Sequence, residues 1–272
     1  MAVQNSTPLL DDFRAISTSQ REEFRENGHI LVRGLLSSRE VGVYRPLIAD
    51  AVRRYRGERR RYAERDHHGR TLLPVMNLWR SDEGVRRFVL SKRLGKVAAD
   101  LLGVGNVRIY HDQALFREPG GGALPWHQDQ YYRPLDTTNT ITCWIPLVDI
   151  EVDMGMLTFA VGSHKNGLAP DLRPGDESEA RYRKYIRDHQ FPISRAAGMR
   201  AGDVSWHYGN TVHSVSANDS ERMREVMTVI YMADGARIVQ PANESQVNDW
   251  NSWLMGLPSG RLAASELNPL VL

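Results

Sequence analysis

Hydrophobic and polar residues follow two different patterns along this chain, and the change comes near residue 107. Before it, apolar residues recur at the spacing of amphipathic helices, most clearly over 91–103, where leucine, valine and alanine share one face. After it, short segments rich in β-branched and aromatic residues are separated by glycine, proline, aspartate and asparagine. The first pattern predicts helices, and the second predicts strands joined by turns.

The N-terminal region carries signals for the ends of these helices. Ser19–Glu22 and Ser37–Glu40 both match the capping-box pattern, and Gly28 stands where a helix commonly ends. The apolar run 29–36 predicts a short strand between two helices, of which the second is amphipathic. We therefore expect residues 1–106 to form a support of helices and strand for the region that follows.

Residues 107–235 carry the strand pattern, and its spacing favours an antiparallel sandwich or barrel, because no helices alternate with the strands as a parallel sheet requires. A polar excursion at 166–200 interrupts this region, and long insertions in compact domains often form lids or binding loops. Residues 236–272, with two tryptophans and several leucines, are expected to cap the barrel or to contact a second subunit. The expected fold is mainly β with flanking helices, in a single domain over 1–272.

Composition narrows the possible partners. A net charge of +2 gives no general reason to expect nucleic acid or an anionic membrane, no apolar run is long enough to span a bilayer, and no signal peptide is visible. The single cysteine, Cys143, excludes an internal disulfide framework and a cysteine-rich zinc site, fits a reducing cytoplasm, and is expected in the core. The basic segment 53–70 predicts a solvated face with Arg59–Arg61 exposed, or a patch for an anionic substrate. Oligomeric state is not determined by these features.

The stretch WHQDQYY places His127 and Asp129 two positions apart, a spacing that nine histidines and 33 acidic residues would produce about once by chance. If these residues are extended, both side chains project from one face toward one point. A third ligand is then needed, and His213 is the best candidate, at the far end of a strand predicted after the Gly202–Asp203 turn. Two histidines and one carboxylate suit a non-haem Fe(II) centre. His207, in the same segment, is expected to be structural.

Arg224 comes eleven residues after His213 and opens an apolar segment that predicts another strand. If the two strands are antiparallel neighbours joined by the polar turn between them, both side chains reach one face. A buried arginine beside an iron with two open positions can grip the distal carboxylate of a dicarboxylate keto acid while the metal chelates its other end. Taken alone, His213 would most commonly be an ordinary strand histidine, and Arg224 a surface arginine. Only their joint spacing after the His127–Asp129 pair favours a metal and co-substrate site.

The segments that carry these residues are PWHQDQYY, ITCWIPLVDIEVDMGMLTFAVGSHKNG and AGDVSWHYGNTVHSVSANDSERMR. In sequence and order they resemble the phytanoyl-CoA dioxygenase family, and QREEFRENGHILVRGLLSSREV resembles the family's usual opening, so the resemblance covers most of the chain. It implies a double-stranded β-helix (jelly-roll, cupin-like) core. It also implies a non-haem Fe(II)/2-oxoglutarate-dependent dioxygenase with 2-oxoglutarate and O₂ as co-substrates.

The resemblance assigns roles to particular positions. The residues that match the family pattern are His127, Asp129 and His213 for iron, with Arg224, Gln113, Thr142 and Trp144 for the co-substrate. Some members use a serine two residues after the distal histidine; this chain has Val215 there, so Thr142 or Ser216 is expected to supply that hydrogen bond, or it is missing. Related halogenases have alanine or glycine in place of the aspartate, so Asp129 disfavours halogenation.

Hydroxylation of a small organic molecule is the default reaction that the resemblance implies, and cyclisation, epimerisation or desaturation can follow from the same radical, here expected in bacterial secondary metabolism. Tyr131, Tyr132 and Trp206 flank the site and are candidates to pack against an apolar or polycyclic substrate, although such aromatics are also ordinary core residues. Two other functions stay open. One is a cupin-like, metal-dependent hydrolase with zinc on the same ligands, which gives Arg224 no role; the other is a catalytically silent jelly-roll that only binds.

Overall fold

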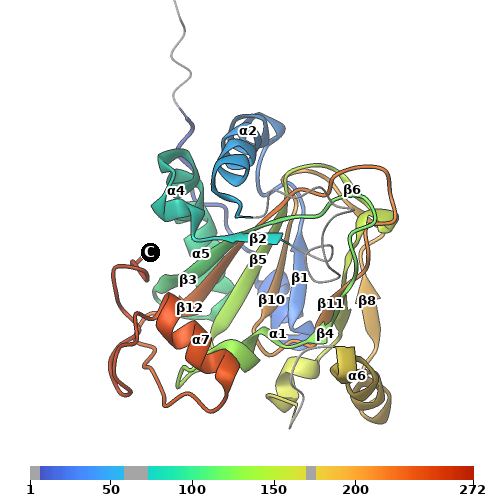
Figure 1. Cartoon of the computed structure of the whole chain (residues 1–272), viewed down its shortest axis with the longest axis vertical. Helices are drawn as coiled ribbons and strands as arrows, with labels where there is room; N and C mark the ends of the chain where they lie inside the picture. Colours follow the sequence, from blue (N-terminus) through green and yellow to red (C-terminus); the bar gives the residue numbers. More distant parts are fainter. Residues whose placement is uncertain (1–6, 58–72, 170–175) are drawn as a thin grey trace, which may run out of the picture.

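The computed structural model describes residues 7–57, 73–169 and 176–272, which form two antiparallel sheets packed face to face (Figure 1). The larger sheet has the order β1 (His29–Val32), β10 (Val204–Tyr208), β5 (Thr140–Pro146), β12 (Val226–Ala233), β3 (Val107–Phe116) and β2 (Leu73–Met76). The smaller sheet has the order β4 (Leu124–His127), β11 (His213–Val215), β7 (Leu157–Ala160) and β8 (Ile193–Arg195). A ribbon of β6 (Ile150–Glu151) and β9 (Gly198–Met199) lies apart from both.

Most strands that pair within one sheet are not consecutive in the sequence, because the chain crosses repeatedly from one sheet to the other. Thus β12 lies between β5 and β3, while β11 lies between β4 and β7. This is the arrangement of a double-stranded β-helix, so the predicted fold class is confirmed. The apolar run predicted as one strand over 29–36 ends early, since β1 stops at Val32.

Helices cover the outer face of the larger sheet and the open ends of the sandwich (Figure 1). Those that pack on the sheet are α1 (Thr18–Asn27), α2 (Ser38–Tyr55), α4 (Glu83–Val89) and α5 (Lys92–Leu102). Two more, α6 (Asp176–Asp188) and α7 (Glu244–Trp253), contact β4 and the short helix η3 (Asp129–Tyr132) respectively. The other short helices are η2 (Leu78–Arg80), η4 (Val152–Met154) and η5 (Ser163–Asn166). Within the described residues, no helix has the length and apolar character needed to cross a membrane.

Two of the three predicted helix starts are confirmed. Helix α5 has Ser91 as its N-cap, and α2 begins with the predicted capping box at Ser37–Glu40. The box predicted at Ser19–Glu22 was wrong, because α1 begins two residues earlier, with Ser17 as N-cap and Gln20 as its partner. Ser17 has the extended backbone that an N-cap requires, whereas Ser19 already lies within the helix.

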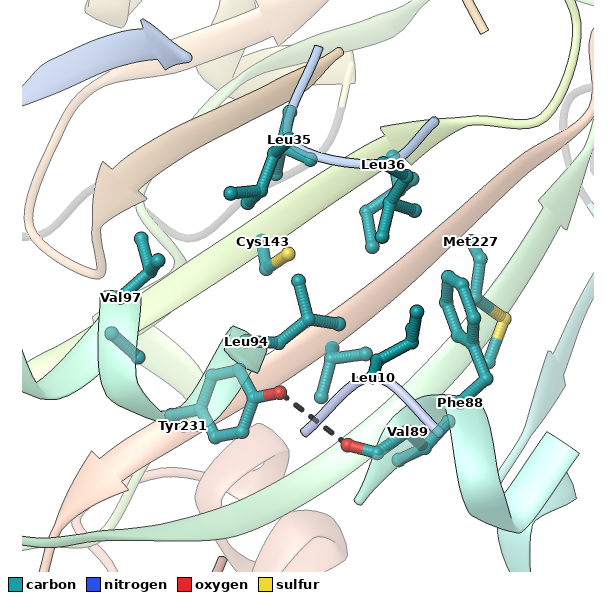
Figure 2. Close-up of a cluster of buried hydrophobic side chains, with 14 of the residues drawn as sticks. Leu10, Leu35, Leu36, Phe88, Val89, Leu94, Val97, Cys143, Met227 and Tyr231 are labelled. Carbon is teal, nitrogen blue, oxygen red and sulfur yellow. Dashed lines mark hydrogen bonds between the residues drawn. The ribbon is translucent and has the colours of Figure 1, made fainter. Parts of the chain in front are cut away.

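The principal hydrophobic core lies between the helices and the outer face of the larger sheet, as Figure 2 shows around Leu94 and Cys143. Cys143 is fully buried there, as its apolar surroundings in the sequence predicted. Because side chains alternate along a strand, Ile141 and Ile145 join Cys143 in this core, while Thr142 and Trp144 face the opposite sheet. The strands therefore separate a face that packs from a face that can bind.

A bulge in β3 decides which of its side chains reach the inner face. Ile230 of β12 pairs with His111, but the next residue, Tyr231, pairs with Ile109, so Tyr110 is the extra residue. Ile109 therefore packs in the core while His111, two positions later, faces the inside of the sandwich. Regular alternation would place both side chains on one face.

The described part of the polar excursion at 166–200 contains α6 and β8, and β8 extends the smaller sheet beside β7. The basic segment 53–70 lies largely outside the described residues, and Arg59–Arg61 lie entirely outside them.

Candidate active site

His127 and His213 lie side by side because they are register partners on neighbouring strands β4 and β11. Their ring centroids are 4.2 Å apart. Asp129 stands at the start of η3, and its Oδ1 lies 3.6 Å from His127 Nε2 and 3.8 Å from His213 Nε2. The sequence predicted that alternation along an extended strand would bring the carboxylate to the histidines, and this geometry was wrong. Strand β4 ends at His127, and the following turn of helix returns Asp129 toward His127.

The hydrogen bonds of both histidines leave one nitrogen free for a metal. The Nδ1 atom of His127 lies 2.8 Å from the carbonyl of Pro125, and that of His213 lies 2.9 Å from the carbonyl of Thr211. Since a carbonyl only accepts, each Nδ1 carries the hydrogen and each Nε2 presents a lone pair toward Asp129. Burial lowers the pKa of both imidazoles, which keeps them neutral. Neutral imidazoles oriented through Nδ1 are the usual form of metal-binding histidine.

The second oxygen of Asp129 is held by the protein. Thr142 Oγ1 donates to Oδ2 at 2.6 Å, and Arg133 Nη2 donates to it at 3.0 Å. Burial alone would raise the pKa of this carboxyl, but the charge of Arg133 holds the pKa well below its usual value. Asp129 is therefore ionised and fixed with Oδ1 toward the two histidines. These three side chains are also the one group that could hold a metal ion among the described residues.

A cavity of about 630 Å³ opens between the two sheets at this cluster, a size that accommodates a drug-sized ligand. Gln113, Thr142 and Trp144 line it from the larger sheet, and Tyr132 lines it from η3. Of the other predicted substrate contacts, Tyr131 is absent from the lining although its ring contacts Tyr132, 5.6 Å away.

One predicted substrate residue, Trp206, does not line the cavity, so that prediction was wrong. Trp206 is fully buried in the core beyond the sheet, because alternation along β10 turns Trp206 outward and its neighbour His207 inward. His207, expected to be structural, lies with its ring 4.3 Å from that of His213 and its Nε2 3.6 Å from Asp129 Oδ2. Within the part of the chain that the structure describes, neither of its ring nitrogens has a hydrogen-bond partner. No pattern in the sequence distinguished His207 from Trp206, since both sit in one short apolar strand.

Arg224 is not among the residues that line the cavity, but it lies directly behind one of them, Trp144. The predicted adjacency of its strand to that of His213 was wrong, because β11 belongs to the smaller sheet and β12 to the larger one. Arg224 instead precedes β12 and exchanges two backbone hydrogen bonds with Arg117, at 2.8 and 2.9 Å. Its guanidinium carbon lies 5.7 Å from the centre of the ring of Trp144, which lines the cavity from β5 of the larger sheet.

The guanidinium of Arg224 is buried without an anion. Only 1% of the residue is exposed, Nη1 donates to the carbonyl of Gly155 at 2.8 Å, and Nε has no hydrogen-bond partner. Among the described residues it forms no ion pair with a carboxylate. Burial lowers the pKa of Arg224 well below its usual value, and the nearby charge of Arg117 adds to this effect. A buried cation in this state is stabilised by an incoming carboxylate. Trp144 Nε1, which is also unpartnered, is a further donor at the same place.

The two hydroxyls considered as substitutes for a serine at Val215 are both engaged within the protein. Thr142 donates to Asp129, and Ser216 Oγ exchanges hydrogen bonds with the backbone of Met156 at 3.2 and 3.3 Å. Val215 itself lines the cavity.

A double-stranded β-helix with two histidines and an aspartate gathered at its cavity defines the class of cupin-fold metal-dependent enzymes. Comparison with known proteins narrows the class. The family model for phytanoyl-CoA dioxygenase (PhyH) matches residues 24–226. The peroxisomal phytanoyl-CoA dioxygenase of Bos taurus is 22% identical over 252 residues, which cover 86% of this chain and 73% of the bovine protein.

Among solved structures, the non-haem alpha-ketoglutarate-dependent carbocyclase SnoK from nogalamycin biosynthesis superposes with a TM-score of 0.76 at 26% identity, over 94% of this chain and 97% of SnoK. The epimerase SnoN, in complex with Fe³⁺, alpha-ketoglutarate and nogalamycin RO, gives a TM-score of 0.75 at 26% identity, over 93% and 97% of the two chains. The chain belongs to the phytanoyl-CoA dioxygenase family. It is an enzyme of the Fe(II)- and 2-oxoglutarate-dependent dioxygenase class.

Proposed function

We propose that this protein oxidises a small organic molecule of natural-product biosynthesis, with iron held by His127, Asp129 and His213 and with 2-oxoglutarate held by Arg224. The observation that carries the co-substrate assignment is the guanidinium of Arg224, buried behind the cavity-lining Trp144 with no carboxylate partner among the described residues. A five-carbon dicarboxylate with one end on the metal places its other carboxylate away from the metal, where such a cation neutralises it.

Each residue of the site has a distinct task in this proposal. When bound, ferrous iron with 2-oxoglutarate and O₂ supplies the oxidant that removes a hydrogen atom from the substrate. The two histidines present neutral Nε2 atoms, and Thr142 and Arg133 keep Asp129 ionised and oriented. The remaining apolar lining of the cavity excludes water and positions the substrate.

A zinc hydrolase on the same three ligands is the less favoured alternative. It would use the His–Asp–His cluster but would leave Arg224 as an uncompensated buried cation, which costs stability without serving the reaction. A silent binding jelly-roll is also disfavoured, since all three ligands and their supporting hydrogen bonds are intact. Hydroxylation, cyclisation, epimerisation and desaturation remain within the proposal, and the likeness to a carbocyclase and an epimerase supports this breadth.

The proposal also covers the domain organisation of the chain, its class of binding partner and its location in the cell. We place residues 1–272 in one oxygenase domain, with 1–106 as support, 107–235 as core and 236–272 as cap. The partner is a small molecule rather than nucleic acid or a membrane, consistent with the net charge of +2, and the single buried cysteine favours the cytoplasm.

Anaerobic titration tests the proposal directly. Addition of Fe(II) and then 2-oxoglutarate to the apo-protein should produce the weak visible charge-transfer band of a metal-chelated keto acid, and the band should require both components. Succinate formation should then be measured against a panel of small aromatic and polycyclic metabolites, where a true substrate accelerates it. Absence of the band, together with ester or amide hydrolysis supported by zinc, would establish the hydrolase instead.

A further inference from the structure

A carboxylate outside the proposed iron site faces the same cavity. Asp249 lies on α7, in the C-terminal segment, and its partly exposed side chain contributes to the lining. Its Oδ2 accepts a hydrogen bond from the hydroxyl of Tyr110 at 2.9 Å. Tyr110 is the extra residue of the β3 bulge, so the same irregularity that turns His111 into the cavity also places this hydroxyl against Asp249.

The charges that line the cavity do not balance. In the described part of the chain the charged lining residues are Asp129, Arg133 and Asp249. Asp129 and Arg133 pair with each other at 3.0 Å, which leaves Asp249 with two neutral donors, the hydroxyl of Tyr110 and the indole of Trp253, and with no ion pair among the described residues. Burial raises the pKa of Asp249 to about 6, so the group is still largely ionised at neutral pH. A partly buried carboxylate without a counter-ion is stabilised by a cationic ligand.

Aromatic rings stand beside this carboxylate. Trp253 follows Asp249 by four residues on α7, so both side chains lie on one helix face, and both line the cavity. The ring of Trp253 lies 5.2 Å from that of His111, and Tyr132 lines the cavity nearby from η3. The indole of Trp253 also donates to Asp249, so the ring and the carboxylate lie together, and a protonated amine is attracted by both groups, since cations bind over aromatic rings.

We infer that Asp249 and Trp253 form the substrate-selecting subsite of this enzyme, and that the substrate they select is an aromatic or polycyclic small molecule bearing a basic amino group. The inference rests on the proposed function, because the subsite shares its cavity with the proposed iron ligands. Asp249 binds the ammonium group, Trp253 covers it, and the apolar remainder of the cavity receives the ring system. The C-terminal segment thereby contributes specificity as well as cover.

The test compares matched amines and alcohols. The probes are benzylamine, naphthylmethylamine and anthracenylmethylamine, each paired with the corresponding arylmethanol, and binding to the full-length protein is followed by calorimetry and by tryptophan fluorescence. Titrations are made with Fe(II) and 2-oxoglutarate under anaerobic conditions and are repeated on the metal-free protein. We expect at least one amine to bind about tenfold or more tightly than its alcohol, the strength of a charge-assisted hydrogen bond. Asp249→Asn should abolish this preference and leave alcohol binding unchanged.

Two further variants separate the charge from other effects. Tyr110→Phe keeps the carboxylate and should keep the amine preference, while Glu221→Gln removes an exposed charge elsewhere and should change nothing. Thermal unfolding verifies that each variant is folded. The inference is overturned if the wild-type protein binds no amine in preference to its alcohol, or if Asp249→Asn weakens amine and alcohol equally. Failure of the proposed function would appear separately, as loss of the 2-oxoglutarate charge-transfer band, because amine selection is also measured without metal.

Discussion

The two faces of the larger sheet are built from the same strands but have opposite characters. The outer face, seen in Figure 2, presents Cys143, Met227 and Tyr231 to the helices in a fully buried apolar layer. The inner face presents Thr142 and Thr228, their immediate neighbours in sequence, to the cavity. A one-residue step along a strand thus separates side chains that pack in the core from side chains that line the cavity.

The faces also differ in how well their polar atoms are satisfied. On the cavity side, His111 Nδ1, Trp144 Nε1 and both ring nitrogens of His207 have no hydrogen-bond partner, and Arg224 Nε nearby has none. On the outer face, Tyr231 donates its hydroxyl to the carbonyl of Val89, although Trp206 Nε1 in the same core has no partner among the described residues. Unpaired buried polar groups reduce stability, so the several that gather around the cavity are a cost that a bound ligand would offset. Substitutions on the two faces should therefore affect activity and stability separately.

The largest effect is expected at the proposed metal centre. His213→Ala removes an iron ligand, so succinate formation should fall to the background rate while the protein stays folded. Coupled assay of succinate and circular dichroism measure the two outcomes. His189→Ala, which changes an exposed histidine on the same chain, is the control and should retain activity. Unchanged succinate formation in His213→Ala would remove His213 from the metal site.

Arg224→Met should raise the 2-oxoglutarate concentration required for half-maximal turnover by about 100-fold or more, the scale of losing one partner of a buried charge pair. Iron binding should persist, and in the absence of 2-oxoglutarate the variant should unfold at a temperature no lower than the wild type, because an unpaired buried charge has been removed. Arg222→Met alters an exposed arginine two residues away and serves as the control. An unaltered 2-oxoglutarate requirement would contradict the assignment.

On the outer face the effect should fall on stability. Leu94 is fully buried against the sheet, and Leu94→Ala should reduce the free energy of unfolding by about 2–5 kcal/mol, since it leaves a cavity in a packed core. Urea denaturation gives this value, and succinate formation by the folded fraction should remain at the wild-type level. Leu270→Ala, at an exposed leucine, should change little. A loss of turnover that exceeds the loss of folded protein would show that the faces are coupled.

The smallest of these effects is expected at Thr142, which hydrogen-bonds to the proposed metal ligand Asp129. Thr142→Val keeps the shape of the side chain but removes the donor to Asp129 Oδ2, so affinity for Fe(II) should fall by about tenfold, as for other groups that orient metal ligands. Competitive metal titration measures this change. Thr158→Val on β7 is a matched substitution away from the site. Equal metal affinities of Thr142→Val and wild type would mean that Arg133 alone positions Asp129.

Sequence patterns predicted much of the fold and the candidate metal-binding residues, but not the backbone geometry that brings these residues together. The helix over 91–103 follows from apolar periodicity and local capping, which depend on residues a few positions apart. Asp129 meets the histidines through a turn of helix, and Arg224 approaches from the other sheet, contrary to the strand geometry that the spacing suggested. Pairing between strands distant in the chain leaves no local signal that would have corrected either expectation.

Residue patterns by themselves indicated helices followed by an antiparallel sandwich or barrel, and the resemblance of short contiguous segments to a known family indicated the jelly-roll core and the candidate residues for iron and the keto acid. Only the tertiary structure decided that His207 and Asp249 share the cavity and that Trp206 does not. A bulge, a strand end and the crossing of the chain between sheets set the direction of each side chain, and all three depend on contacts across the fold.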